Sequence, residues 1–400
     1  MRMTWSKYAR SVLAGVFFLA LYAANALGYD GLVEKKSYEL PAPYTTVGGA
    51  LIRQMRVGYE TLGTLNQAGD NAILIPHFFS GNSHFAGKYK ASDAAPGYWD
   101  AIVGPGKALD TDKYFLIGVD TLANVNAKDG ITVTTGPASI DPATAKPYGM
   151  RFPQVQIRDQ VNVQKALLDW LGVKKLHAVM GASMGSMQAY EWAAAHPEMV
   201  ARIIPVIPAA AVDAYTLAKL HDISAAVMLD PKWAKGDYYG GAEPNDGMAL
   251  ALRLLTWSSL APDWADAGYG RKWADPVRDP AKDMAAGYAV GAYLDSVGAA
   301  RAKALDADSL IYTVRANELF SLGGKASVEE GLKLIKARVL LLPSKNDQLL
   351  SPEKTRQVRD LLKAQGNQVE YLELDGPLGH LNGVSRIGQA SETIRRFLAE

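Results

Sequence analysis

A serine between two glycines constrains this chain more than any other feature of its sequence. Residues 181–185 read Gly-Ala-Ser-Met-Gly and follow an apolar run, residues 176–180, that predicts a strand. Residues 187–195 have the composition of a helix. A strand that turns into a helix through G-x-S-x-G holds its serine on a sharp turn, and the glycines leave room for the reversal. The pattern predicts a nucleophilic Ser183 at the end of a strand.

A serine hydroxyl is a weak nucleophile at neutral pH, so Ser183 requires a base and a carboxylate that orients the base. His380 lies in a glycine-rich loop after a predicted strand over residues 369–374, and Asp347 follows a predicted strand over residues 337–343. The order Ser183, Asp347, His380 is that of the catalytic triad in α/β-hydrolases. The alternatives are a solvated loop histidine and an acid at a helix N-terminus.

The same chemistry requires two backbone N–H donors for the oxyanion that forms on the substrate carbonyl. Met184 supplies one, because it directly follows the serine. Residues 72–76 predict an early strand, and we expect the second donor from Phe79 in the loop that follows. The alternative for Phe79 is an ordinary core residue.

Apolar runs and helical segments alternate along the chain, which predicts an α/β fold with a mostly parallel sheet. After the run at residues 202–208 the pattern changes, and residues 209–332 show helical spacing without a convincing strand. We therefore expect a catalytic core over residues 27–208 and 333–400, interrupted by a helical lid over residues 209–332. The lid's Trp and Tyr residues either pack in its core or line a pocket.

The N-terminal segment has the three parts of a secretory signal peptide. Arg2, Lys7 and Arg10 are basic, residues 12–24 are apolar, and residues 24–26 read Ala-Asn-Ala. We expect residues 1–26 to be cleaved after Ala26, giving a periplasmic or secreted protein without stable membrane insertion. The alternative is an anchor that is never cleaved.

Composition excludes several other functions. The chain has 42 Lys and Arg against 41 Asp and Glu, without a basic cluster, so nothing indicates nucleic-acid binding. It has no cysteine, which excludes disulfides and thiolate metal sites, and its six histidines show no metal-ligand spacing. We expect neither a metal nor a cofactor.

Five separated segments carry the motifs of a known family. Residues 181–192 read GASMGSMQAYEW and residues 77–84 read HFFSGNSH. They resemble the patterns GGSMGGMQALEW and HALTGDSH of the homoserine O-acetyltransferase family of α/β-hydrolases, and residues 135–139, 148–153 and 230–238 are similar to further segments of that family. The resemblance implies an acyl-serine enzyme with an eight-stranded sheet and a helical lid, often a homodimer built through that lid.

Three positions depart from the family in ways that concern the substrate. Members that acylate homoserine carry an arginine that ends a GLxxAR segment and an aspartate after the catalytic histidine. Here those positions are Leu252 and Leu381, and Ser80 replaces the threonine of HALTG. Arg253 is one residue further along, about 100° around a helix, so we do not expect it to substitute. A zwitterion without partners for its charges binds poorly, and homoserine is therefore disfavoured. The alternative is that both leucines only pack and the carboxylate is held elsewhere.

These observations predict an exported, serine-dependent acyl-transfer enzyme that acts on a small ester or acyl donor and uses water as the acceptor, which makes it an ester hydrolase. An O-acyltransferase that uses acyl-CoA is the first alternative. A non-catalytic binding protein on a hydrolase scaffold is the second.

Overall fold

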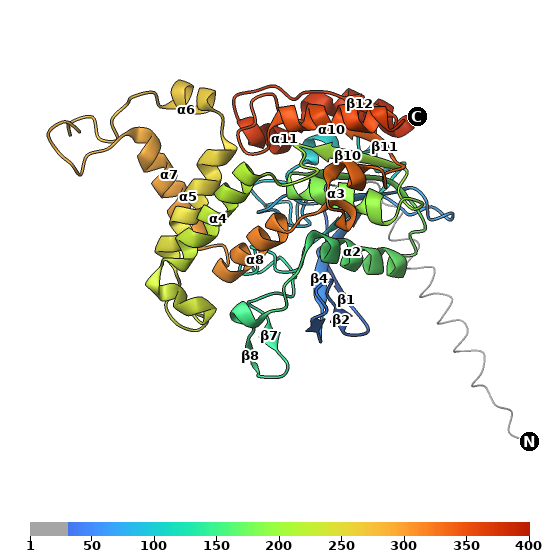
Figure 1. Ribbon diagram of the computed structural model, residues 1–400, viewed down its shortest axis with the longest axis horizontal. Coiled ribbons are helices and arrows are strands. Elements are labelled where there is room, and N and C mark those ends of the chain that lie inside the picture. The colour runs from blue at the N-terminus through green and yellow to red at the C-terminus, as the bar shows by residue number, and fades with distance from the viewer. Residues whose placement is uncertain (1–30) are drawn as a thin grey trace, which may run out of the picture.

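The computed structural model describes residues 31–400, and an eight-stranded sheet forms its centre (Figure 1). The strand order is β1-β4-β6-β5-β9-β10-β11-β12. Strand β4 pairs antiparallel with β1 and β6, and the remaining neighbours are parallel. The predicted α/β-hydrolase fold is confirmed. The strands are β1 (Lys36–Glu39), β4 (Arg56–Leu62), β5 (Ala72–Pro76), β6 (Phe115–Val119), β9 (Leu176–Ala182), β10 (Arg202–Val206), β11 (Arg338–Leu341) and β12 (Val369–Tyr371).

Both faces of the sheet are covered, which explains why its central strands are apolar throughout. Successive side chains point to opposite faces, so Leu74 belongs to one core and Ile73 to the other. The first core includes residues of helices α2 (Ile157–Leu171), α3 (Met184–Ala195) and α10 (Pro352–Ala364). The second core includes residues of α12 (Ser391–Ala399).

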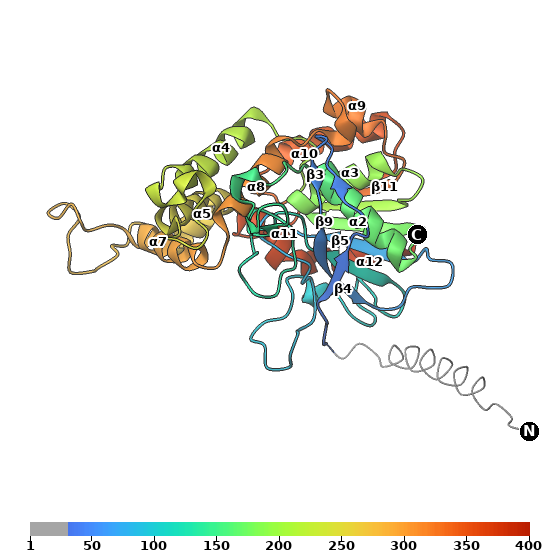
Figure 2. The same ribbon diagram turned by 90° about the horizontal axis from the view of Figure 1, so that it is seen from below.

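Six helices lie between β10 and β11, and several of them stand beside the sheet rather than on it (Figures 1 and 2). They are α4 (Ala214–Met228), α5 (Asn245–Ser259), α6 (Pro262–Gly268), α7 (Ala289–Ala302), α8 (Ala307–Glu318) and α9 (Val328–Leu332). Apolar side chains of α4, α5 and α8 share a separate core. We call α4 to α8 the lid. Helix α9 contributes Leu332 to the core of the sheet instead.

The remaining elements are short. They are β2 (Tyr44–Thr45), β3 (Leu51–Ile52), β7 (Ile140–Asp141), β8 (Lys146–Pro147), α11 (Asn382–Ser385) and 3-10 helices at Asp100–Ile102, Gly149–Arg151, Pro231–Gly236, Leu322–Gly324, Gly379–Leu381 and Ile387–Ala390. Within residues 31–400, no helix has the length and apolar character that crossing a bilayer requires. The expected signal peptide, residues 1–26, lies outside the described residues and stays a prediction.

A buried acid, Asp308, lies where the lid meets the core. One of its carboxylate oxygens accepts a hydrogen bond from the Trp233 indole at 2.8 Å, while the other oxygen is buried without a hydrogen-bond partner in the described part of the chain. Burial raises the pKa of Asp308 to about 7, and the nearby Asp306 carboxylate adds to the effect. Near neutral pH the folded protein therefore retains a proton that the unfolded chain releases.

We expect this acid to make stability depend on pH. The raised pKa of Asp308 leaves the free energy of unfolding undiminished below the unfolded pKa near 4. As the pH rises from there through about 7, the free energy of unfolding falls, because the unfolded chain releases a proton that the folded protein retains. In Asp308→Asn the side chain stays neutral, so the stability advantage of the variant over wild type should grow by about 2 kcal/mol between pH 5 and pH 8. Urea unfolding at both pH values measures it. An advantage of equal size at the two pH values would contradict the assignment.

Candidate active site

The serine turn depends on two close backbone approaches. Ser183 has φ 55° and ψ −117°, a conformation that L-residues rarely adopt. A Cβ atom on Gly181 would lie 2.3 Å from the carbonyl oxygen of Gly185, and one on Gly185 would lie 2.2 Å from that of Pro76. Only glycine fits at either position. Helix α3 can then begin directly against the end of β5, with Ser183 at its N-terminus.

The three residues of the predicted triad meet at the carboxyl ends of the parallel strands. His380 Nε2 lies 2.8 Å from Ser183 Oγ, and His380 Nδ1 lies 2.6 Å from Asp347 Oδ2. All three side chains are buried. The second oxygen of Asp347 accepts hydrogen bonds from the N–H groups of Leu349 and Leu350 at 2.8 and 2.9 Å, which fixes the carboxylate. A base that contacts a serine and is oriented by a carboxylate is the arrangement for nucleophilic catalysis.

Asn382 holds the histidine loop against the aspartate loop. Its side-chain amide donates to Ser344 Oγ and to the carbonyl of Gly376, both at 3.0 Å. Ser344 in turn donates to the carbonyl of Gly379 at 2.7 Å. Because Asn382 and Ser344 are fully buried, these bonds are shielded from water and restrict the position of His380.

Hydrogen bonds of His77, Asn124 and Asn126 fix the loop that carries Phe79. The His77 ring accepts from the N–H of Thr121 at 3.2 Å and lies 2.7 Å from the carbonyl of Phe78. Asn124 and Asn126 donate to the carbonyl of Gly81 at 3.1 and 3.0 Å. Burial lowers the pKa of His77, which keeps its ring neutral and able to accept a hydrogen bond.

A cavity of about 250 Å³ opens beside Ser183 and His380. The predicted residues Phe79, Ser80 and Leu381 line it. Met184 is buried at the start of α3, where its N–H has no acceptor within the helix. The remaining lining residues are Phe78, Ile207, Leu255, Thr256, Ser259, Arg301, Leu349 and Val384. The wall is therefore largely apolar, with one permanently charged side chain.

The structure places Leu252 away from this cavity. Its side chain is fully buried in the lid core. The residues of α5 that line the cavity are Leu255, Thr256 and Ser259, which begin one turn beyond Leu252. Arg253 also points elsewhere and pairs with Asp295 at 2.7 Å on the lid surface. Leu252 therefore does not contact a substrate held in this cavity. The lid residues Trp233, Tyr238, Tyr239, Trp257 and Trp264 do not line it either.

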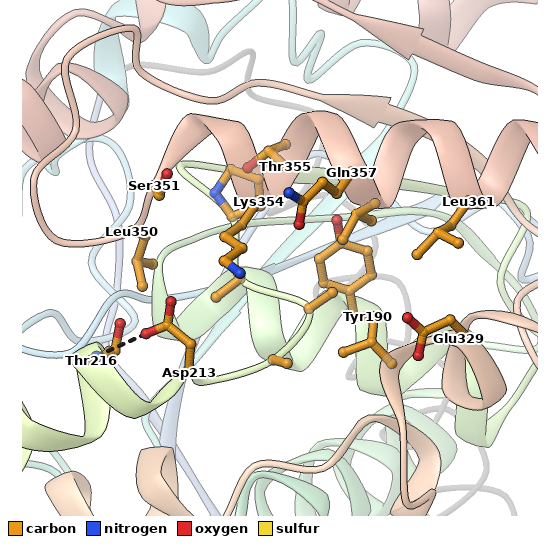
Figure 3. A pocket seen from close by; sticks show the side chains of 16 residues that line it. Tyr190, Asp213, Thr216, Glu329, Leu350, Ser351, Lys354, Thr355, Gln357 and Leu361 are labelled. Atoms are coloured by element: carbon orange, nitrogen blue, oxygen red, sulfur yellow. Dashed lines mark hydrogen bonds between the residues drawn. The ribbon is translucent and has the colours of Figure 1, made fainter.

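A second cavity, of about 230 Å³, is lined by helix α10 and by the segment that follows β10 (Figure 3). Tyr190, Asp213 and Lys354 contribute to its wall, and Asp213 accepts a hydrogen bond from the N–H of Thr216 at 2.8 Å. None of Ser183, Asp347 and His380 lines it. The chemistry therefore belongs to the first cavity. Within residues 31–400, no group of three or more His, Asp or Glu side chains is placed to hold a metal ion.

Comparison with known proteins agrees with this geometry. A model of the alpha/beta hydrolase fold matches residues 97–382. A homoserine O-acetyltransferase of Symbiobacterium thermophilum is 40% identical over 361 residues, which are 90% of this chain and 92% of that protein.

Two solved structures extend the comparison. Esterase E22 is 46% identical with a TM-score of 0.87, and the match covers 92% of this chain and 100% of that chain. The homoserine O-acetyltransferase from Bacillus anthracis is 36% identical with a TM-score of 0.88, over 92% of this chain and 98% of that chain.

The chain belongs to the homoserine O-acetyltransferase-like family of α/β-hydrolases. Membership identifies it as an enzyme and supports acyl transfer. Because both an esterase and acetyltransferases are similar over nearly the whole chain, the fold does not select between water and an alcohol as acceptor.

We expect Gly185→Ala to damage this homoserine O-acetyltransferase-like enzyme through its fold. The added methyl group would meet the Pro76 carbonyl at 2.2 Å, so α3 or β5 must shift, at a cost of at least about 2 kcal/mol. Gly291→Ala in α7 is the control, because nothing lies within 4 Å of its Cβ position. Urea unfolding should show a lowered midpoint for Gly185→Ala only. Equal midpoints in the two variants would show that the close approach is not required.

Proposed function

We propose that this enzyme hydrolyses small carboxylic esters through an acyl-serine intermediate. The contact between His380 Nε2 and Ser183 Oγ carries the proposal, because it places the base on the proton that must leave the serine. The similarity to esterase E22 over nearly the whole chain also supports it.

In the first half-reaction Ser183 Oγ attacks the ester carbonyl carbon while His380 takes the hydroxyl proton. Asp347 accepts the hydrogen bond from the other ring nitrogen, which holds the imidazole and stabilises its positive charge. The N–H groups of Phe79 and Met184 are the proposed donors to the oxyanion. Collapse of the tetrahedral intermediate breaks the bond to the alcohol, which leaves with the proton from His380.

In the second half-reaction a water molecule attacks the acyl-serine. His380 takes a proton from the water, the carbonyl carbon again becomes tetrahedral, and the bond to Ser183 breaks as the serine regains its proton. The products are a carboxylic acid and a free enzyme. The cavity is smaller than the roughly 300–1,000 Å³ typical of drug-sized ligands, which supports short acyl chains.

Transfer of the acyl group to homoserine is the second candidate, supported by the acetyltransferase relatives. The cavity wall argues against it. It has Leu381 beside His380 and contains neither Asp nor Glu, so an ammonium group in the cavity would lack a partner.

Release of p-nitrophenol from short acyl esters tests the proposal. Wild type should turn over continuously in water, and Ser183→Ala should lose at least about a thousand-fold in kcat. Homoserine or another alcohol should leave the steady-state rate nearly unchanged. A single burst that becomes turnover only after an alcohol is added would instead establish an acyltransferase.

A further inference from the structure

Arg301 is an arginine without a carboxylate partner in the active-site cavity. It lies in the last turn of α7, is partly buried, and lines the same cavity as Ser183 and His380. Among residues 31–400, no Asp or Glu oxygen lies within 4 Å of its guanidinium. Its one side-chain hydrogen bond runs from Nη1 to Thr256 Oγ1 at 3.1 Å.

The lid is built to bring this arginine to the cavity. Helices α5 and α7 pack side by side, and a Cβ on Gly298 would lie 2.5 Å from the carbonyl oxygen of Ala249, so glycine allows the close approach (Figure 1). Thr256 donates its hydroxyl proton to the Leu252 carbonyl at 2.6 Å, which leaves its oxygen free to accept from Arg301. Only one of the five guanidinium N–H donors is used in this way.

An arginine in this position is costly unless something pairs with it. Burial lowers the pKa of Arg301, because the charge loses water and no carboxylate replaces it. On the neighbouring helix α5, by contrast, Arg253 has such a partner in Asp295. The remaining donors of Arg301 match the two oxygens of a carboxylate, which a guanidinium binds through paired hydrogen bonds.

We propose that Arg301 is a specificity-determining residue that binds a carboxylate of the substrate, at a distance from the ester bond that Ser183 attacks. The substrates are then esters with one free carboxylate and no ammonium group nearby, because Arg301 has no acidic counterpart in the cavity wall. The carboxylate belongs either to the alcohol part or to the acyl part of the ester. This inference rests on the proposed hydrolysis through Ser183.

Matched esters test the proposal and separate the two sources. For the alcohol part, 4-acetoxybutyrate is compared with butyl acetate, its uncharged counterpart. For the acyl part, monomethyl glutarate is compared with methyl pentanoate. O-acetyl-homoserine carries the same carboxylate as 4-acetoxybutyrate together with an ammonium group. A pH-stat records the acid released from each ester.

We expect wild type to favour the carboxylate ester of at least one pair in kcat/KM and to favour 4-acetoxybutyrate over O-acetyl-homoserine. Arg301→Met should lower the ratio of kcat/KM between the charged and the neutral ester by about 10- to 100-fold, mainly through KM. Arg301→Lys should restore part of the ratio because it keeps the charge. Arg253→Met, which removes a surface arginine of the same lid, should leave the ratio unchanged.

Two results would overturn the inference: a wild-type enzyme that hydrolyses both members of each pair equally well, or an Arg301→Met variant that loses activity on charged and neutral esters alike. Failure of the proposed function is distinguishable, since wild type would then hydrolyse none of the five esters. Equal melting temperatures for the variants establish that a changed ratio does not come from a damaged fold.

Discussion

The active site depends on how closely helix α3 approaches the end of strand β5. Contact between Gly185 and the Pro76 carbonyl leaves no space for a side chain, and the sharp turn from β9 into α3 holds Ser183 at a positive φ. A strained serine persists only where its surroundings determine it completely. Here they do, because Ser183 donates its N–H to the Val206 carbonyl at 2.9 Å and Ser186 Oγ donates to the Ser183 carbonyl at 2.6 Å. The position of the Ser183 hydroxyl at the cavity is therefore a result of packing around the sheet.

The rest of the site is arranged around that fixed hydroxyl by loops from other strands. Asp347 and His380 reach it from the ends of β11 and β12, and Asn382 ties their loops together. Hydrogen bonds from Asn124 and Asn126 hold the Phe79 loop opposite. The lid adds Arg301 from α7, which packs against α5. Catalytic groups thus come from the rigid sheet, while substrate preference is set by an insertion that can vary independently.

The sequence predicted the sheet and the triad because both depend on local patterns. Buried parallel strands are continuous apolar runs, and residues after such strands meet at one edge of the sheet. Strand β1 was missed, since it lies at the edge and only Tyr38 of its four residues is buried. Asn124, Asn382 and Arg301 were also missed. Their roles arise from contacts between distant segments, and an arginine on a helix shows the same local pattern whether it faces solvent or a cavity. Leu252 was expected near the substrate from its motif position, but the cavity lies one turn further along α5.

The central claim is that Ser183 is an activated nucleophile, and labelling with an organophosphonate ester tests it most directly. Such a reagent reacts with a serine whose proton is taken by a base and whose developing oxyanion is stabilised. The account predicts one adduct per chain, located on Ser183 by peptide mass spectrometry, with loss of esterase activity in proportion to labelling. An active enzyme that carries no adduct on Ser183 after prolonged incubation would contradict it.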